Sequence, residues 1–146
     1  RGEVPDDPDF TVPFGVANIL REGTDVTVVA IAGSVPRALA AAEEMAKEGV
    51  SVEVIDPRTL VPLDKETILN SVGKTGRLVV ADPAAKVCSA ASEIMSIVGE
   101  EAFWDLQAPM QKVASKQVHI PFSPSLEKLV YPTSDDIIES IKKTLG

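Results

Sequence analysis

The distribution of apolar residues along the chain predicts a sheet of buried strands. Residues 26–32 (VTVVAIA) are almost uniformly apolar and rich in β-branched side chains, which is typical of a strand covered on both faces. Three further apolar segments are expected to form strands, at residues 50–55, 77–81 and 110–114. Because strands buried on both faces occur mainly in parallel sheets, the pattern favours a mostly parallel sheet.

Segments with apolar residues three and four positions apart lie between these strands and after the last one. They predict helices at about residues 35–49, 65–76, 89–103 and 134–145. Asp64 is placed to cap the second helix, and Thr133 or Ser134 the last, because short polar side chains accept hydrogen bonds from first-turn amides. Since helices that alternate with strands cover both faces of a sheet, the predicted fold class is α/β, a three-layer αβα sandwich.

The first 14 residues differ from the rest of the chain. RGEVPDDPDFTVPF contains three prolines and a cluster of acids but no apolar period. Residues 1–14 are therefore interpreted as an extended linker from a missing upstream domain, and the lack of an initial Met fits that expectation. Residues 15–146 are expected to form one domain around a single core.

The net charge of −8 limits the classes of partner. Nucleic acids and anionic membranes are bound through concentrated basic patches, which the sequence does not show, whereas a basic protein partner is compatible with it. No apolar run approaches the roughly 18 to 20 residues that span a bilayer. The single Cys88 cannot form an internal disulfide. We expect a cytoplasmic protein, or one of the mitochondrial matrix if the source is eukaryotic.

Residue types that carry chemistry are sparse. The turn Gly33-Ser34 follows a predicted strand and precedes a helix, where α/β proteins often bind anions, but neither G-x-G-x-x-G nor a P-loop is present. His119 is the only imidazole and Cys88 stands near a predicted helix start, and both are interpreted mainly as structural. No catalytic, cofactor-binding or metal-binding residue is assigned. A stand-alone anion- or ligand-binding module using the Gly33-Ser34 turn is the alternative function.

Three acids near the end of the third predicted helix form a candidate partner site. Glu101 and Asp105 are four residues apart, so a helix continuing through both would place their carboxylates on one side, next to Glu100. Such a patch could receive Lys or Arg from a partner, although acidic helix ends are commonly only solvated.

Three stretches of the sequence resemble one enzyme family. They are REGTDVTVVA at 21–30, EVIDPRTLVPLDKETILNSVGKTGRLVV at 53–80 and APMQKVASKQVHIPFSPSLEKLVYPTSDDII at 108–138, and the middle one is the most specific. Together they resemble the C-terminal domain of the β-subunit of thiamine-dependent 2-oxo-acid and acetoin dehydrogenases, which is similar to the C-terminal domain of transketolase. The resemblance implies a mostly parallel sheet flanked by helices, as the apolar pattern does independently.

The resemblance also implies a function. In the family, thiamine diphosphate and magnesium lie between the α-subunit and another domain of the β-subunit, so this chain is expected to bind no cofactor and to be inactive alone. Its expected role is association with a second β-subunit and an α-subunit, and docking to the subunit-binding domain of a dihydrolipoyl acyltransferase. Glu101 and Asp105, with Ile141 and Leu145 of the last helix, are the candidate partner-binding residues.

Two segments bear on subfamily and docking. Many relatives carry an acid in an L-[DE]-A-P motif, where this chain has LQAP at 106–109, so one expected docking charge is missing. Pyruvate and branched-chain relatives usually carry a Gly-Gly pair where this chain has AAKVCS at 84–89. That Cys-Ser, and PFSPSLE at 121–127, resemble acetoin-type relatives. The resemblance therefore favours acetoin as substrate, with pyruvate and branched-chain 2-oxo acids as alternatives.

Overall fold

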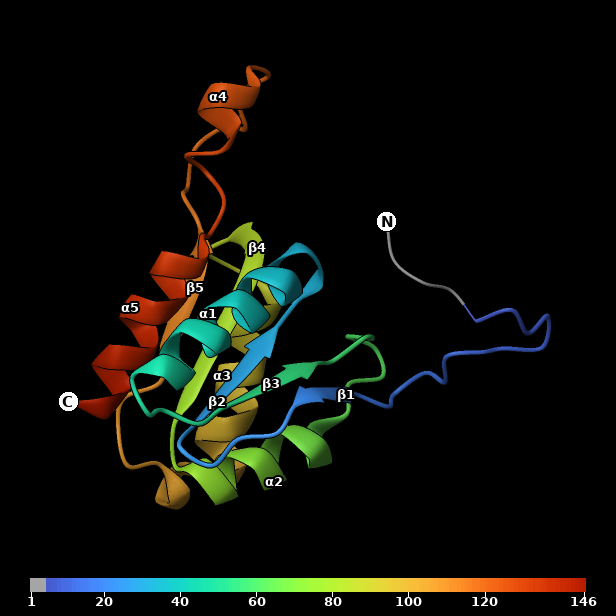
Figure 1. Ribbon diagram of the computed structural model, residues 1–146, viewed down its shortest axis with the longest axis vertical. Coiled ribbons are helices and arrows are strands. Elements are labelled where there is room, and N and C mark those ends of the chain that lie inside the picture. The colour runs from blue at the N-terminus through green and yellow to red at the C-terminus, as the bar shows by residue number, and fades with distance from the viewer. Residues whose placement is uncertain (1–4) are drawn as a thin grey trace.

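A five-stranded sheet forms the middle layer of the protein, whose computed structural model describes residues 5–146 (Figure 1). The strands are β1 (Asn18–Arg21), β2 (Val26–Ala30), β3 (Val52–Asp56), β4 (Leu78–Ala85) and β5 (Gln111–Ser115). Their spatial order is β1-β3-β2-β4-β5, with β1 antiparallel to β3 and the other pairs parallel. The sheet is therefore mostly parallel, and the four predicted strands are confirmed.

Strand β2 lies at the centre of the sheet, and all of its residues are buried. Val28 pairs with Val54 of β3 on one side and with Val79 of β4 on the other. The edge strand β1 is absent from the predicted elements, because none of its residues is buried and it carries no alternating apolar signal.

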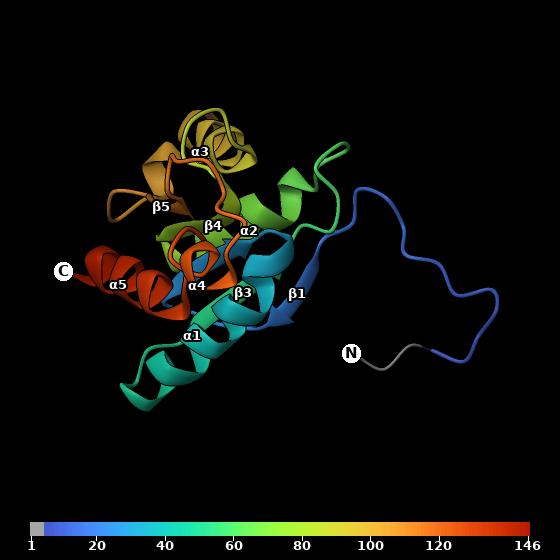
Figure 2. The same cartoon turned by 90° about the horizontal axis from the view of Figure 1, so that it is seen from above.

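Helices cover both faces of the sheet. The helices α1 (Val35–Lys47) and α5 (Ser134–Leu145) pack on one face, and α2 (Lys65–Thr75) and α3 (Ala90–Glu101) on the other (Figure 2). Each face has its own buried cluster, with Ala38 and Ile137 in the first and Ile68 and Ile94 in the second. This arrangement confirms the predicted three-layer αβα sandwich. Within residues 5–146, no helix has both the length and the apolar character needed to cross a membrane.

Polar side chains fix where two helices begin. Asp64 accepts a hydrogen bond from the amide of Thr67 at 3.1 Å and caps α2, as predicted. Thr133 caps α5 in a capping box, in which the Asp136 carboxylate also accepts from the Thr133 amide. The capping residue of α5 is therefore Thr133, one of the two predicted candidates.

The end of α3 differs from the expectation. The helix ends at Glu101, and a 3-10 turn, Phe103–Asp105, follows it. Ala102 leaves helical geometry with φ −134° and ψ 24°. The helix predicted to about residue 103 thus ends two residues earlier and does not continue through Asp105, so Glu101 and Asp105 do not share a helical face.

Two segments leave the body of the fold (Figure 1). Residues 116–131, here called the arm, connect β5 to α5 and carry the short helix α4 (Pro124–Glu127). The amide of Lys116 donates to the carbonyl oxygen of Val130 at 3.0 Å, so the two ends of the arm meet at its base. Residues 5–14 extend away from the sheet without helix or strand. Their interpretation as a linker from an upstream domain stays a prediction.

Candidate docking surfaces

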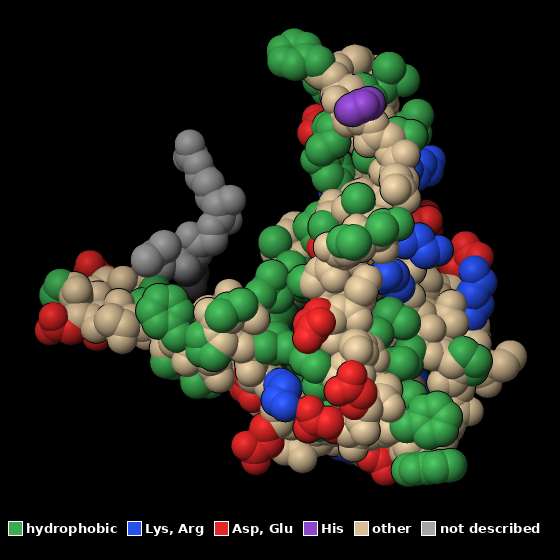
Figure 3. Space-filling model, turned by 180° about the vertical axis from the view of Figure 1, so that it is seen from behind, with side chains coloured by type: hydrophobic (Ala, Val, Ile, Leu, Met, Phe, Trp, Pro, Cys, Tyr) green, Lys and Arg blue, Asp and Glu red, His purple; other side chains and the backbone are tan. Residues whose placement is uncertain are grey.

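The apolar side chains of the arm are exposed. Phe122 has a relative exposure of 104% and Leu129 of 62%, and Val118, Ile120 and Leu126 are also more than half exposed. Figure 3 shows hydrophobic side chains along this projection. Single exposed apolar residues are ordinary, but a group of them on one projecting segment is typical of an interaction surface. The arm is therefore the first candidate docking surface.

The sequence contains only an indirect signal of this surface. Val118, Ile120 and Phe122 alternate as in a strand, but Pro121 and Pro124 interrupt the segment. Because proline cannot donate to a sheet ladder, this segment is not expected to form a central strand of the core. Apolar residues on a proline-interrupted segment are the signal from which the arm could have been found.

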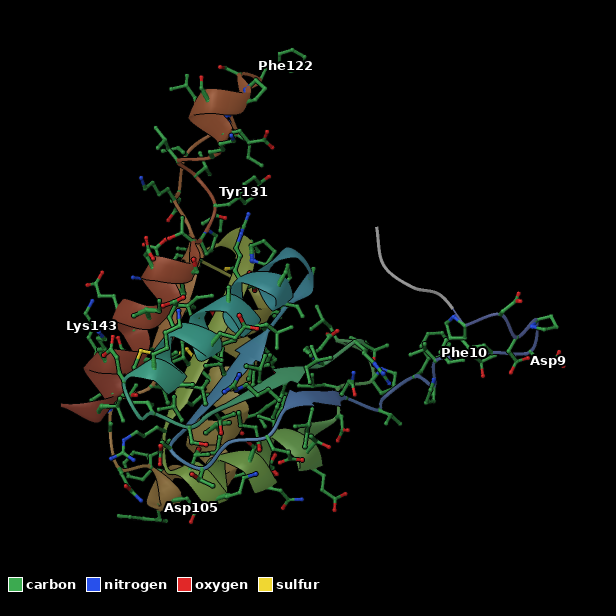
Figure 4. All side chains as sticks on the ribbon, viewed as in Figure 1. Asp9, Phe10, Asp105, Phe122, Tyr131 and Lys143 are labelled. Carbon is green, nitrogen blue, oxygen red and sulfur yellow. The ribbon has the colours of Figure 1, made fainter. Side chains whose placement is uncertain are left out.

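The acidic candidates lie at the opposite end of the molecule from the arm, as the labels of Asp105 and Phe122 show in Figure 4. Glu101 forms an ion pair with Lys65 at 2.7 Å, so its charge is already matched within the chain. Asp105 is exposed in the 3-10 turn, and no cation lies within ion-pair distance of it among residues 5–146. Of the two predicted acids, Asp105 has the more available charge.

Two aromatic residues stand beside this acid. The rings of Phe103 and Trp104 pack edge to face with centroids 5.1 Å apart. Trp104 is 93% exposed, although aromatic residues of this kind are enriched in the buried centres of protein interfaces. We call residues 101–105 the aromatic corner. The sequence analysis identified the two acids of this corner but missed Phe103 and Trp104. On a longer helix, these two neighbouring residues would point in different directions and would not form one patch with the acids.

The last helix does not present both predicted residues to a partner. Ile141 is completely buried in the cluster that α5 shares with α1 and the sheet. Because none of its surface is exposed, Ile141 cannot contact a partner of the folded domain. This corrects the prediction that it is a partner-binding residue, and its role is to pack in the core. Leu145 packs half-buried against the same cluster, and its contact with a partner stays a prediction.

The Gly33-Ser34 turn does not form an open anion site. Gly33 is exposed, but Ser34 is fully buried, and its hydroxyl has no hydrogen-bond partner among the described residues. A soluble anion at this turn would therefore meet no side-chain donor from Ser34.

Neither Cys88 nor His119 has the surroundings of a catalytic group. Cys88 is exposed at a positive φ of 55° ahead of α3, while the first-turn amide of Ala91 donates to Asp82 at 3.1 Å. His119 lies on the arm over a shallow hollow that it shares with Ala85, Gln117 and Val118, and no acid or nucleophile lines this hollow. A catalytic imidazole needs such a partner within hydrogen-bond reach.

A buried carboxylate beneath α2 is the main electrostatic feature of the interior. Glu53 of β3 is 1% exposed, and its Oε1 accepts hydrogen bonds from the ammonium group of Lys74 and from the amide of Gly23. Burial alone would raise the pKa of Glu53, but the hydrogen bonds outweigh burial and lower this pKa below its ordinary value. The hydrogen bond to Glu53 in turn raises the pKa of Lys74. This pair joins the sheet to α2 and is structural.

Comparisons with known proteins agree with the fold. The family model described as "Transketolase, C-terminal domain" matches residues 15–137. The chain is 45% identical, over 99% of its length, to the acetoin:2,6-dichlorophenolindophenol oxidoreductase subunit beta of Cupriavidus necator. It is 47% identical, over 100% of its length, to the pyruvate dehydrogenase E1 component subunit beta of Leifsonia xyli subsp. xyli. The chain spans 43% of each of these relatives.

A solved structure is similar as well. The chain matches "Split gene transketolase, inactive beta4 tetramer" with a TM-score of 0.81 and 30% identity, over 99% of this chain and 47% of that one. Sequence and structure thus confirm the resemblance that the three stretches at 21–30, 53–80 and 108–138 indicated. The chain belongs to the transketolase C-terminal domain family.

Proposed function

We propose that the chain is the C-terminal domain of the β-subunit of a thiamine-dependent dehydrogenase complex that acts on acetoin or a 2-oxo acid. Matches to two β-subunits over almost the whole chain support this proposal. Because one relative is named for acetoin and the other for pyruvate at similar identity, this domain does not separate the two substrates. The bacterial relatives support a cytoplasmic location.

The domain's own proposed work is association with a second β-subunit and an α-subunit. The observation that carries it is the arm, where Phe122 and its apolar neighbours project into solvent. Burial of apolar area contributes roughly 25 cal/mol per Å², so covering these side chains by another subunit favours assembly. The solved relative named as a beta4 tetramer agrees with a β-subunit that associates with copies of itself.

Thiamine diphosphate and magnesium are proposed to bind elsewhere in the assembly. Within residues 5–146, no group of three His, Cys, Asp or Glu side chains is placed to hold a metal ion. Magnesium in such sites is held by carboxylates together with the phosphates of the ligand. We propose that the domain supports catalysis by holding the subunits together.

Self-association tests the role of the arm. Size-exclusion chromatography with light scattering should give a dimer or larger species for the wild-type chain at micromolar concentration. The double change Phe122→Ser and Leu129→Ser should shift it to a monomer, with an unchanged circular dichroism spectrum. Leu60→Ser with Val61→Ser is the matched control, since both are exposed apolar residues off the arm. A wild-type monomer at all concentrations, or an equal effect of the control, contradicts the proposal.

We further propose that the aromatic corner docks to the subunit-binding domain of a dihydrolipoyl acyltransferase. Its exposed Asp105 suits a basic partner, and Trp104 offers apolar area beside that charge. Glu101→Lys with Asp105→Lys should weaken binding by at least about tenfold. Glu43→Lys with Glu44→Lys, on the exposed face of α1, changes the net charge equally and should have a small effect. Undiminished affinity after reversal at the aromatic corner would exclude this surface.

A further inference from the structure

A hollow at the base of the arm gathers cationic side chains. It has a volume of about 410 Å³ and lies among β5, the residues that follow β4, the base of the arm and one side of α5. The lysines that line it are Lys86, Lys112, Lys116, Lys128 and Lys143. They are five of the 14 Lys and Arg residues in a chain whose net charge is −8. Figure 3 shows Lys and Arg side chains gathered below the base of the arm. We call this feature the lysine hollow.

One of these lysines is held in place without being neutralised. Lys112 is half-buried, and its ammonium group donates to the carbonyl oxygen of Lys86 at 2.8 Å and to the hydroxyl of Ser92 at 2.7 Å. Both acceptors are uncharged. Because Ser92 belongs to α3, on the face of the sheet opposite α5, the ammonium group of Lys112 points to the α3 side of β5 and adds its uncompensated charge to the hollow from behind the strand.

The two acids that line the hollow, Asp136 and Glu139, already bind other residues that line it. Glu139 forms an ion pair with Lys143 at 2.7 Å. Asp136 Oδ2 accepts from the amide and the hydroxyl of Thr133, at 2.8 and 2.7 Å, in the capping box. Across residues 5–146, no carboxylate lies within ion-pair distance of the remaining lysines, Lys86, Lys116 and Lys128. The lysine hollow thus keeps a local excess of positive charge on an acidic protein.

The size of the hollow and its donors indicate the class of ligand. A volume of this order is typical of small-molecule sites, whereas nucleic acid requires an extended basic surface. Lysine ammonium groups bind phosphoryl oxygens as point charges, so several of them can approach one compact anion from different directions. All cations that line the described hollow are lysines, and the hydroxyls of Tyr131 and Ser140 line it as well. We propose that the lysine hollow binds a compact anion carrying two or more phosphoryl groups.

Binding at this place ties the arm to the body of the domain. Lys116 and Lys128 belong to the two sides of the arm, and Lys86 and Lys112 belong to the body. An anion that contacts both sets bridges them. The ligand therefore restrains the segment that carries the exposed apolar residues.

Isothermal titration calorimetry of the wild-type chain with pyrophosphate, at physiological salt, tests the site. Lys86→Gln with Lys128→Gln should weaken binding by at least about tenfold, equivalent to about 1.4 kcal/mol. Both side chains are exposed, so the circular dichroism spectrum should be unchanged. The control is Lys47→Gln with Lys65→Gln, two exposed lysines outside the hollow whose loss changes the net charge equally. This control should alter the affinity less than about twofold.

Three results would overturn the proposal. The first is no binding of pyrophosphate by the wild-type chain, and the second is an equal loss of affinity in the control variant. The third comes from a hexaglutamate peptide titrated into the same samples. If it binds more tightly than pyrophosphate and depends on Lys86 and Lys128, the hollow receives an acidic protein segment and not a phosphorylated small molecule.

Discussion

Glu53 shows how a single charge is accommodated inside the sheet. Its Oε1 takes hydrogen bonds from Lys74 and Gly23, while Oε2 has no partner among the described residues. The Lys74 side chain is 42% exposed, so Lys74 contacts water whereas Glu53 is shielded from it. Loss of the carboxylate charge therefore weakens the contacts of Glu53, while Lys74 can still turn to water.

Glu53→Gln should lower the free energy of unfolding by about 1–3 kcal/mol at neutral pH. Glu22→Gln is the control, because Glu22 is exposed and its contact to Lys74 is 3.4 Å long, so its loss should cost less than about 0.5 kcal/mol. The pKa of Glu53 is lowered in the folded state, so its contribution is present above the ordinary carboxyl pKa and is lost as pH falls through the folded value. Urea titrations at neutral and acidic pH, followed by circular dichroism, should show the difference shrinking in acid. Equal stability of wild type and Glu53→Gln at neutral pH contradicts this account.

Gly23 is required by the close approach of two backbones. A Cβ at this position would stand 2.2 Å from the backbone nitrogen of Glu53 and 2.2 Å from the carbonyl carbon of Val52. Gly23→Ala should therefore cost about 2 kcal/mol or more, because backbone atoms of β3 must shift. Gly33→Ala has no atom within 4 Å of the new Cβ and should change stability by less than about 1 kcal/mol. Urea titrations of the two variants compare them, and similar losses would mean that the sheet accommodates the methyl group.

At the scale of elements, the helices α1, α3, α4 and α5 each follow a hydroxyl residue, but of these only α5 is capped by that side chain. Thr133 accepts from the amide of Asp136, whereas Ser123, before α4, makes no side-chain cap bond. Thr133→Ala should cost about 1 kcal/mol and Ser123→Ala less than about 0.5 kcal/mol. Chemical denaturation measures both. A Thr133→Ala chain as stable as wild type would show that the capping box does not stabilise α5.

The elements that the sequence predicts are those whose own residues carry a burial pattern. The uniformly apolar β2 and the apolar spacing of α5 are of this kind. Two features lack such a pattern in their own residues. Strand β1 is defined by its pairing with β3, as between Asn18 and Asp56, and α3 ends where the backbone of Ala102 leaves helical geometry. Ile141 shows the same limit at the site, because helical spacing reveals an apolar face but not whether the core or a partner covers it.

At the scale of the whole molecule, the arm is an insertion into a body that closes without it. Lys116 and Val130 are joined by a backbone hydrogen bond, and the apolar residues between them are largely exposed. Replacement of residues 117–129 by a short Gly-Ser linker should therefore leave the free energy of unfolding within about 1 kcal/mol of wild type. The shortened chain should also lose self-association. Chemical denaturation followed by circular dichroism tests the stability, and light scattering tests the self-association. A shortened chain that does not fold would show that the body of the domain needs the arm.

The exposure of Trp104 gives the protein an intrinsic label. It is the only tryptophan, and it is 93% exposed in the folded chain, so its fluorescence should respond little to unfolding. It should respond instead to whatever covers the aromatic corner. A partner that docks there shifts the emission to shorter wavelength, whereas a ligand in the lysine hollow, whose residues Tyr131 and Lys143 lie away from Asp105 in Figure 4, leaves the spectrum unchanged. The emission colour of one residue thus tells the two surfaces apart without any added probe.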